Sequence, residues 1–121
     1  MKIHESAQDY LETILILKLE NSRVKSIDVA KKMNVTKQSV HRAIKNLAEN
    51  DYITIEEGNI SLTEKGNEIA TKMYERHTLL ASFFISLGVD KEIAFEDACK
   101  IEHDISDQSF DAIRKLLDKG E

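Results

Sequence analysis

Three short fragments of the sequence carry side chains whose types and spacing suit the binding of a divalent metal ion. Asp9 and Glu12 are carboxylates three residues apart, which places both on one face of a helix. His77 lies in a long stretch with helical periodicity. A thiol, a carboxylate and an imidazole then follow at helical positions i, i+3 and i+4, at Cys99, Glu102 and His103. This mixed set of sulfur, oxygen and nitrogen donors suits Fe²⁺, Mn²⁺, Co²⁺ or Zn²⁺.

Each fragment taken alone also has an ordinary structural explanation. A glutamate and a histidine on an acidic helix are usually solvated, and a cysteine is usually a small core residue. An aspartate near a helix start most often complements the helix dipole. The prediction of a metal site therefore rests on the three fragments together.

The elements that must position these side chains are mostly helices. The chain has no proline, so helices can run without interior breaks. Apolar residues at helical spacing predict six helices. Their expected ranges are 7–20, 27–33, 37–49, 64–87, 91–104 and 107–118. The expected N-caps of the last five are Ser26, Thr36, Thr63, Asp90 and Ser106.

Between the third and fourth helices the periodicity changes from helical to alternating. Residues 52–56 and 60–62 alternate apolar with polar side chains, and Gly58-Asn59 between them offers a turn with positive φ. This pattern predicts a short β-hairpin. Because it follows two helices joined by a tight turn at Asn34-Val35, it is typical of the wing of a winged helix-turn-helix.

The charge of the chain is unevenly distributed. Residues 23–50 contain seven basic and two acidic side chains, a local charge of +5, although the whole chain carries −5. The rest of the chain therefore carries −10. A basic region on an acidic body suggests a DNA-binding head, because only the contacting surface needs to neutralise phosphates. A solvated basic helix face would give the same charge pattern.

The third helix is the expected recognition helix, which lies in the major groove of double-stranded DNA. Gln38 and Ser39 have side chains that can reach base edges, and Arg42 can reach either guanine or a phosphate. Lys37 and Lys45 are expected to contact phosphates, which set register rather than sequence choice. The full set of expected DNA-facing residues is Thr36, Lys37, Gln38, Ser39, His41, Arg42 and Lys45. The alternative is a helical core with a solvated polar face.

Composition narrows the class of protein. No apolar run approaches the roughly 20 residues of a membrane span, and no secretory signal is visible after Met1. The single cysteine, Cys99, cannot form an internal disulfide and fits a reducing compartment. We therefore expect a cytoplasmic protein without a membrane partner.

From Asp9 to about Leu117 the chain resembles the iron- and manganese-dependent repressors, the family typified by the diphtheria toxin repressor and the manganese transport regulator. The resemblance is carried by Asp9-Tyr10-Leu11-Glu12, the helix-turn-helix from Ala30 to Leu47, Leu62-Thr63-Glu64-Lys65-Gly66, Arg76-His77 and Asp97-Ala98-Cys99-Lys100-Ile101-Glu102-His103.

The resemblance implies a metal site and a set of metals. Asp9 and Glu12 resemble the manganese-type regulators, whereas Cys99 resembles the iron type. Two further ligand positions of the iron type are Ala81 and Phe95 here, so an iron-type ancillary site is not expected. Fe²⁺ or Mn²⁺ is the implied corepressor, with Zn²⁺ or Co²⁺ as substitutes in vitro. The implied ligands are Asp9, Glu12, His77, Cys99, Glu102 and His103.

The expected fold is mainly α, with a winged helix-turn-helix domain at residues 1–63 and a helical metal-binding and dimerisation domain at residues 64–121. Asp9 and Glu12 of the first helix would contribute to the metal site. The implied function is a homodimeric repressor that binds operator DNA of metal-homeostasis genes when metal is bound.

Two other functions compete with this one. A winged-helix dimer could respond to an organic ligand or to oxidation of Cys99, without metal. A metalloenzyme is not expected, because Glu102-His103 does not match the His-Glu-x-x-His arrangement of zinc proteases and the chain has no glycine-rich phosphate loop.

Overall fold

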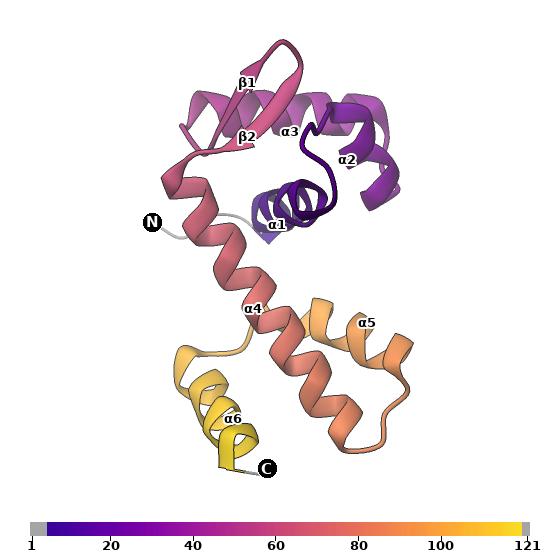
Figure 1. Ribbon diagram of the computed structural model, residues 1–121, viewed down its shortest axis with the longest axis vertical. Helices are drawn as coiled ribbons and strands as arrows, with labels where there is room; N and C mark the ends of the chain where they lie inside the picture. The colour runs from indigo at the N-terminus through magenta and orange to yellow at the C-terminus, as the bar shows by residue number, and fades with distance from the viewer. Residues whose placement is uncertain (1–4, 120–121) are drawn as a thin grey trace. The chain divides into compact units, whose positions relative to one another are not determined.

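Six helices and one two-stranded antiparallel sheet make up the part of the chain that the computed structural model describes, residues 5–119 (Figure 1). A mainly α fold with a winged helix-turn-helix is thereby confirmed. The elements are α1 (Glu5–Glu20), α2 (Ser26–Met33), α3 (Lys37–Glu49), β1 (Ile53–Glu56), β2 (Asn59–Leu62), α4 (Glu64–Ser86), α5 (Lys91–Ile101) and α6 (Asp107–Lys119).

The chain divides into two compact units between Lys72 and Met73, within α4, and we describe each unit by itself. The outer ends of the two expected domains, residues 1–4 and 120–121, lie outside the described residues, as does the N-terminus searched for a secretory signal. None of the described helices is long and apolar enough to cross a membrane.

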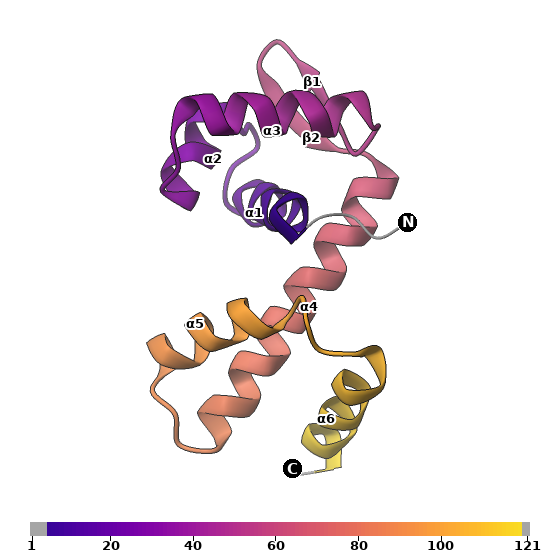
Figure 2. The same ribbon diagram turned by 180° about the vertical axis from the view of Figure 1, so that it is seen from behind.

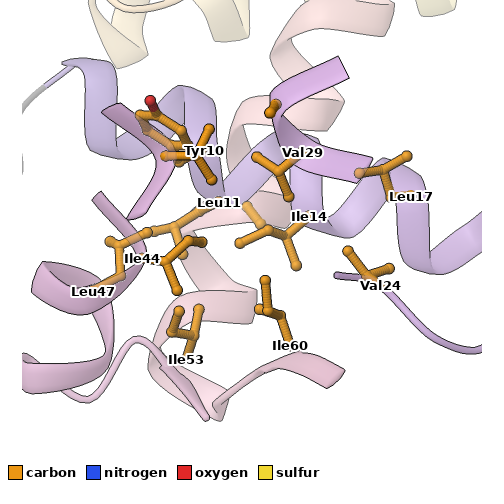
Figure 3. Packing of buried hydrophobic residues seen from close by; sticks show 13 residues of the cluster. Tyr10, Leu11, Ile14, Leu17, Val24, Val29, Ile44, Leu47, Ile53 and Ile60 are labelled. Atoms are coloured by element: carbon orange, nitrogen blue, oxygen red, sulfur yellow. The ribbon is translucent and has the colours of Figure 1, made fainter. Parts of the chain in front are cut away.

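The N-terminal unit is built around the apolar face of α1. Leu11 and Ile14 are completely buried, as the helical spacing of apolar residues requires. Figure 3 shows them among Ile44 of α3 and Ile53 and Ile60 of the two strands. Because α3 and the hairpin both pack against α1 in this shared core, the polar face of α3 is oriented outward.

The turn between α2 and α3 is closed by local hydrogen bonds. Asn34 ends α2 in the left-handed conformation with φ 55°, which asparagine tolerates. Thr36 caps α3 as expected, because its Oγ1 accepts a hydrogen bond of 3.1 Å from the Ser39 amide. The expected cap at Ser26 was wrong. Ser26 is the first residue of α2, and Asp28 caps the helix by accepting a 2.9 Å bond from the Lys25 amide.

The hairpin forms one residue earlier than expected. Its turn residues are Glu57 and Gly58, with φ 51° and 77°, and not Gly58-Asn59. Two consecutive residues with positive φ make the type of turn that matches the twist of a two-residue hairpin. Asn59 is therefore the first residue of β2, where it pairs with Glu56. Its Oδ1 accepts bonds of 3.0 Å from the Val24 amide and from the amine of Lys18, which tie the wing to α1.

Thr63 caps the start of α4 as expected, because its Oγ1 accepts a 3.1 Å bond from the Gly66 amide. The backbone of Gly66 lies so close to β1's start that a Cβ here would stand 2.0 Å from the carbonyl oxygen of Tyr52. Glycine is thus the residue that permits this close approach of strand and helix.

In the C-terminal unit the second part of α4 packs with α5 and α6 (Figure 2). Leu80 and Ala81 of α4, Ala98 of α5 and Phe110 of α6 form its buried cluster. At the start of α6, Ser106 acts as the expected cap, since its Oγ accepts a 3.1 Å bond from the Ser109 amide.

Asp90 stands at the N-cap position of α5, as expected, although its side chain makes no capping bond. The expected extent of α5 was wrong. The helix ends at Ile101, so Glu102 and His103 lie in the turn that follows it and not in the helix.

Candidate metal centre and nucleic-acid interface

A buried carboxylate in the C-terminal unit lies between two imidazoles. The Oε2 atom of Glu102 is 3.7 Å from Nδ1 of His77, and its Oε1 atom is 3.5 Å from Nε2 of His103. The side chain of Glu102 has no exposed surface, and that of His103 is 3% exposed. His77 comes from α4 and the other two from the turn after α5, so the packing of α4 against α5 brings them together.

The hydrogen bonding of His77 suits a metal ligand. Its Nε2 atom lies 3.2 Å from the carbonyl oxygen of Phe95, which can only accept. In the neutral imidazole this places the proton on Nε2 and the lone pair on Nδ1, the atom that faces Glu102. Ligating histidines are commonly oriented by such a bond from the second ring nitrogen. The ring of Phe95 also packs edge-on against that of His77, with centroids 5.6 Å apart.

The spacing of these atoms fits coordination. Ligand atoms bonded to a metal at 2.0–2.2 Å stand roughly 3.0–3.5 Å from one another in tetrahedral or octahedral geometry. The separations of 3.5 and 3.7 Å between Glu102 and the two imidazoles are close to this range. Carboxylate and imidazole are both ligands that Fe²⁺, Mn²⁺, Co²⁺ and Zn²⁺ accept, and each oxygen of Glu102 lies beside a different imidazole. The residues present therefore fit a divalent transition metal.

Of the other three expected ligands, Asp9 and Glu12 belong to the N-terminal unit and Cys99 belongs to the C-terminal unit. Asp9 and Glu12 share one face of α1 in the N-terminal unit, where Glu12 is buried and the carbonyl of Asp9 accepts a 2.8 Å bond from Thr13. Cys99 is exposed on α5. The part of these three residues in a metal site stays a prediction.

The helix α3, which is the expected recognition helix, has the polarity that DNA binding requires. Its inner face is closed by Val40, Ile44 and Leu47, which are 1–4% exposed. The seven residues expected to face DNA are all exposed: Thr36, Lys37, Gln38, Ser39, His41, Arg42 and Lys45. The hydroxyl groups of Thr36 and Ser39 also bond to each other, at 2.9 Å, so they are partly engaged within the protein.

An open hollow of about 680 Å³ lies between the start of α2 and the exposed face of α3. Ser26 and Ile27 of α2 line it together with Lys37, His41 and Arg42. Sequence reasoning did not include Ser26 or Ile27 in the DNA-facing set. An isoleucine at helical spacing is usually a core residue, yet Ile27 is 43% exposed and borders this basic surface.

The comparisons with known proteins cover both units. Residues 2–58 match the family model of the N-terminal DNA binding domain of the iron dependent repressors, and residues 63–121 match the model of their metal binding and dimerisation domain. The chain belongs to the iron-dependent repressor family. The protein is therefore a transcriptional regulator with a metal-binding domain and not an enzyme, and the metal-free alternative is not favoured.

Individual members of the iron-dependent repressor family support the assignment. An uncharacterized HTH-type transcriptional regulator of Methanocaldococcus jannaschii is 36% identical, over 95% of this chain and 94% of its own length. The transcriptional regulator MntR of Shouchella clausii is 35% identical, over 93% and 79%. The solved structure of the manganese regulator SloR superposes with a TM-score of 0.82 at 27% identity, over 98% of this chain. This chain spans only 55% of that solved chain.

Proposed function

We propose that this protein is a metal-dependent repressor in which Fe²⁺ or Mn²⁺ acts as corepressor for binding operator DNA of metal-homeostasis genes, in the cytoplasm and as a homodimer. The observation that carries the proposal is the buried Glu102 carboxylate between His77 and His103, in a chain whose α3 exposes a basic, polar face. The names of the relatives MntR and SloR, the second a manganese regulator, support the choice of metal.

The proposed centre draws ligands from both units. His77, Glu102 and His103 supply the cluster described above, and Cys99 supplies a thiolate from α5. From α1, the carboxylates of Asp9 and Glu12 complete the set. The helical metal-binding domain is proposed to begin at residue 64 and the DNA-binding domain to end at residue 63, so the two carboxylates of α1 belong to the other domain.

Charge provides the link between metal and DNA. Without metal, the carboxylates of Asp9 and Glu12 repel that of Glu102, which disfavours any arrangement that brings α1 to the centre. A bound divalent cation supplies the positive charge that makes this arrangement favourable. Fixing α1 in this way also fixes the position of the whole DNA-binding unit, because α3 and the wing pack on the core that α1 forms.

Metal acts in this proposal by its different affinity for two arrangements of the units. In the metal-bound dimer, the two copies of α3 would lie about 34 Å apart, the length of one turn of B-DNA, and enter successive major grooves. Lys37 and Lys45 would contact phosphates, while Gln38 and Arg42 would contact bases.

An anaerobic titration of DNA binding tests the proposal. The probe is a labelled duplex selected in vitro with the metal-loaded protein, and its anisotropy is measured at fixed salt with chelator, Fe²⁺, Mn²⁺ or Zn²⁺. Affinity should rise about tenfold to a hundredfold with Fe²⁺ or Mn²⁺, the range of a typical coupling between two sites. Equal affinity in chelator and in saturating metal would contradict the proposed function.

A further inference from the structure

The arginine that precedes His77 in α4 is buried in the C-terminal unit. Only 6% of Arg76 is exposed, and an arginine is almost never buried to this extent unless it is paired. Its Nη1 donates to the carbonyl oxygens of Glu102, at 3.1 Å, and of Ile105, at 2.9 Å. Its Nη2 pairs with the carboxylate of Asp107. One side chain thus bonds three points of the segment that follows α5.

The segment between the two helices is a turn, in which the amides of Glu102 and Ile105 still donate to the carbonyl oxygens of Ala98 and Ile101. It lies between the end of α5 at Ile101 and the start of α6 at Asp107. Carbonyl groups after the end of a helix need donors from elsewhere when they are buried. The planar guanidinium of Arg76 supplies donors in a fixed geometry, and it lies 5.2 Å from the centre of the buried Phe110 ring. Its position is therefore well defined.

Two consecutive residues of α4 lie beside the two ends of Glu102. Its carbonyl oxygen accepts from Arg76, and its carboxylate lies 3.7 Å from Nδ1 of His77. Adjacent residues of a helix project about 100° apart, so the two side chains approach Glu102 from different directions. The backbone that carries Glu102 and His103 is thus fixed by a residue that offers no metal ligand itself.

We propose that Arg76 is a positioning residue of the metal centre, which sets the spacing of Glu102 and His103 by holding the carbonyl groups of Glu102 and Ile105. This role rests on the proposed function, because it requires that Glu102 and His103 bind metal. A residue that only stabilised the unit would change the fraction of folded protein. A positioning residue also changes the metal affinity of the protein that is folded.

The test compares Arg76→Lys with the wild type in the 121-residue chain. Lysine keeps the charge but cannot reproduce the planar fork that reaches both carbonyl groups. Mn²⁺ affinity, measured by competition with a fluorescent chelator, should fall about tenfold to a hundredfold, the usual effect of losing a residue that orients ligands. The visible absorption bands of the Co²⁺-loaded variant should also change, because they report ligand geometry.

Arg114→Lys is the matched control. The guanidinium of Arg114 lies 4.9 Å from the centre of the same Phe110 ring and its Nη2 is 3.9 Å from a carboxylate oxygen of Glu75, but it makes no bond to the Glu102 carbonyl in the described residues. Its Mn²⁺ affinity and Co²⁺ bands should match the wild type. A folded Arg76→Lys variant with wild-type affinity and wild-type bands would overturn the role of Arg76.

Asp107→Asn keeps the test decisive if Arg76→Lys does not fold. This variant removes the charge that pairs with Arg76 and helps to hold its guanidinium against the two carbonyl groups, so both carbonyl bonds should weaken and a smaller loss of Mn²⁺ affinity is expected. Unchanged affinity and unchanged Co²⁺ bands in that case would overturn the role. A wild-type protein that binds neither Mn²⁺ nor Fe²⁺ would overturn the proposed function itself, and this role with it.

Discussion

The Nδ1 atom of His77 faces the Oε2 atom of Glu102 at 3.7 Å, although one residue lies in the middle of α4 and the other follows α5. The second nitrogen of the same imidazole lies 3.2 Å from the carbonyl oxygen of Phe95, which fixes the ring and places the lone pair towards Glu102. The C-terminal unit therefore presents an oriented imidazole to a buried carboxylate, and this pair is the core of the proposed centre.

Replacing Glu102 by glutamine should abolish most of the stabilisation by metal. At a Mn²⁺ concentration about 100 times its dissociation constant, the wild type should gain about 2.7 kcal/mol in free energy of unfolding. A variant that binds a hundredfold more weakly would gain only about 0.4 kcal/mol under the same conditions. Thermal unfolding with Mn²⁺ and with chelator measures both values. Glu92→Gln, an exposed change in α5, should retain the full gain.

The exposed face of α3 predicts which variants lose DNA affinity. Arg42→Ala and Gln38→Ala should each weaken binding to the selected duplex by roughly 1–3 kcal/mol, the cost of losing a good contact to a base. Lys115→Ala, which removes an exposed charge from α6, is the control and should change little. Mn²⁺ affinity should be unchanged in all three. If both α3 variants bind the duplex normally, another element reads the bases.

Cys99 should set the preference between metals. A thiolate favours Fe²⁺, Co²⁺ or Zn²⁺, whereas Mn²⁺ prefers carboxylate oxygens. Cys99→Glu should therefore shift activation of DNA binding towards Mn²⁺, and Cys99→Ala should weaken Fe²⁺ activation more than Mn²⁺ activation. The metal concentrations at half-maximal DNA binding are compared under anaerobic conditions. Unchanged midpoints in Cys99→Ala would remove this exposed residue from the site.

The junction of the wing and α4 should be sensitive to a single methyl group. In Gly66→Ala the new Cβ would stand 2.0 Å from the carbonyl oxygen of Tyr52, so strand and helix must separate. Overpacking of this kind costs about 1–3 kcal/mol, and denaturant unfolding should show a loss at the upper end of that range or beyond. Lys65→Ala, at the preceding position, should cost much less. Equal stability of the two variants would show that the strand and the helix can separate at this junction without loss of stability.

Local sequence features predicted most of the fold because they act over a few residues. The apolar spacing of Leu11 and Ile14 placed the buried face of α1, and the hydroxyl groups of Thr36 and Thr63 marked the starts of α3 and α4. The hairpin turn was displaced because Glu57 adopts a positive φ, which its residue type does not favour.

The candidate site was less predictable because it depends on distant parts of the chain. Helical spacing grouped Cys99 with Glu102 and His103, but spacing does not show that α5 ends at Ile101. The contacts of Arg76 could not be predicted from the sequence either, since its partners lie in the segment after α5 and are fixed only by tertiary packing.

The claim that ligands from α1 couple metal to DNA is tested most directly with Glu12→Gln. Glu20→Gln is the control, because it makes the same change at an exposed position of the same helix. DNA affinity is measured with chelator and with saturating Mn²⁺, and Mn²⁺ binding is measured separately. The wild type and Glu20→Gln should bind DNA about tenfold to a hundredfold more tightly with Mn²⁺. Glu12→Gln should still bind Mn²⁺ through the cluster of His77, Glu102 and His103 but lose most of this increase. A Glu12→Gln protein with the full increase would contradict the claim.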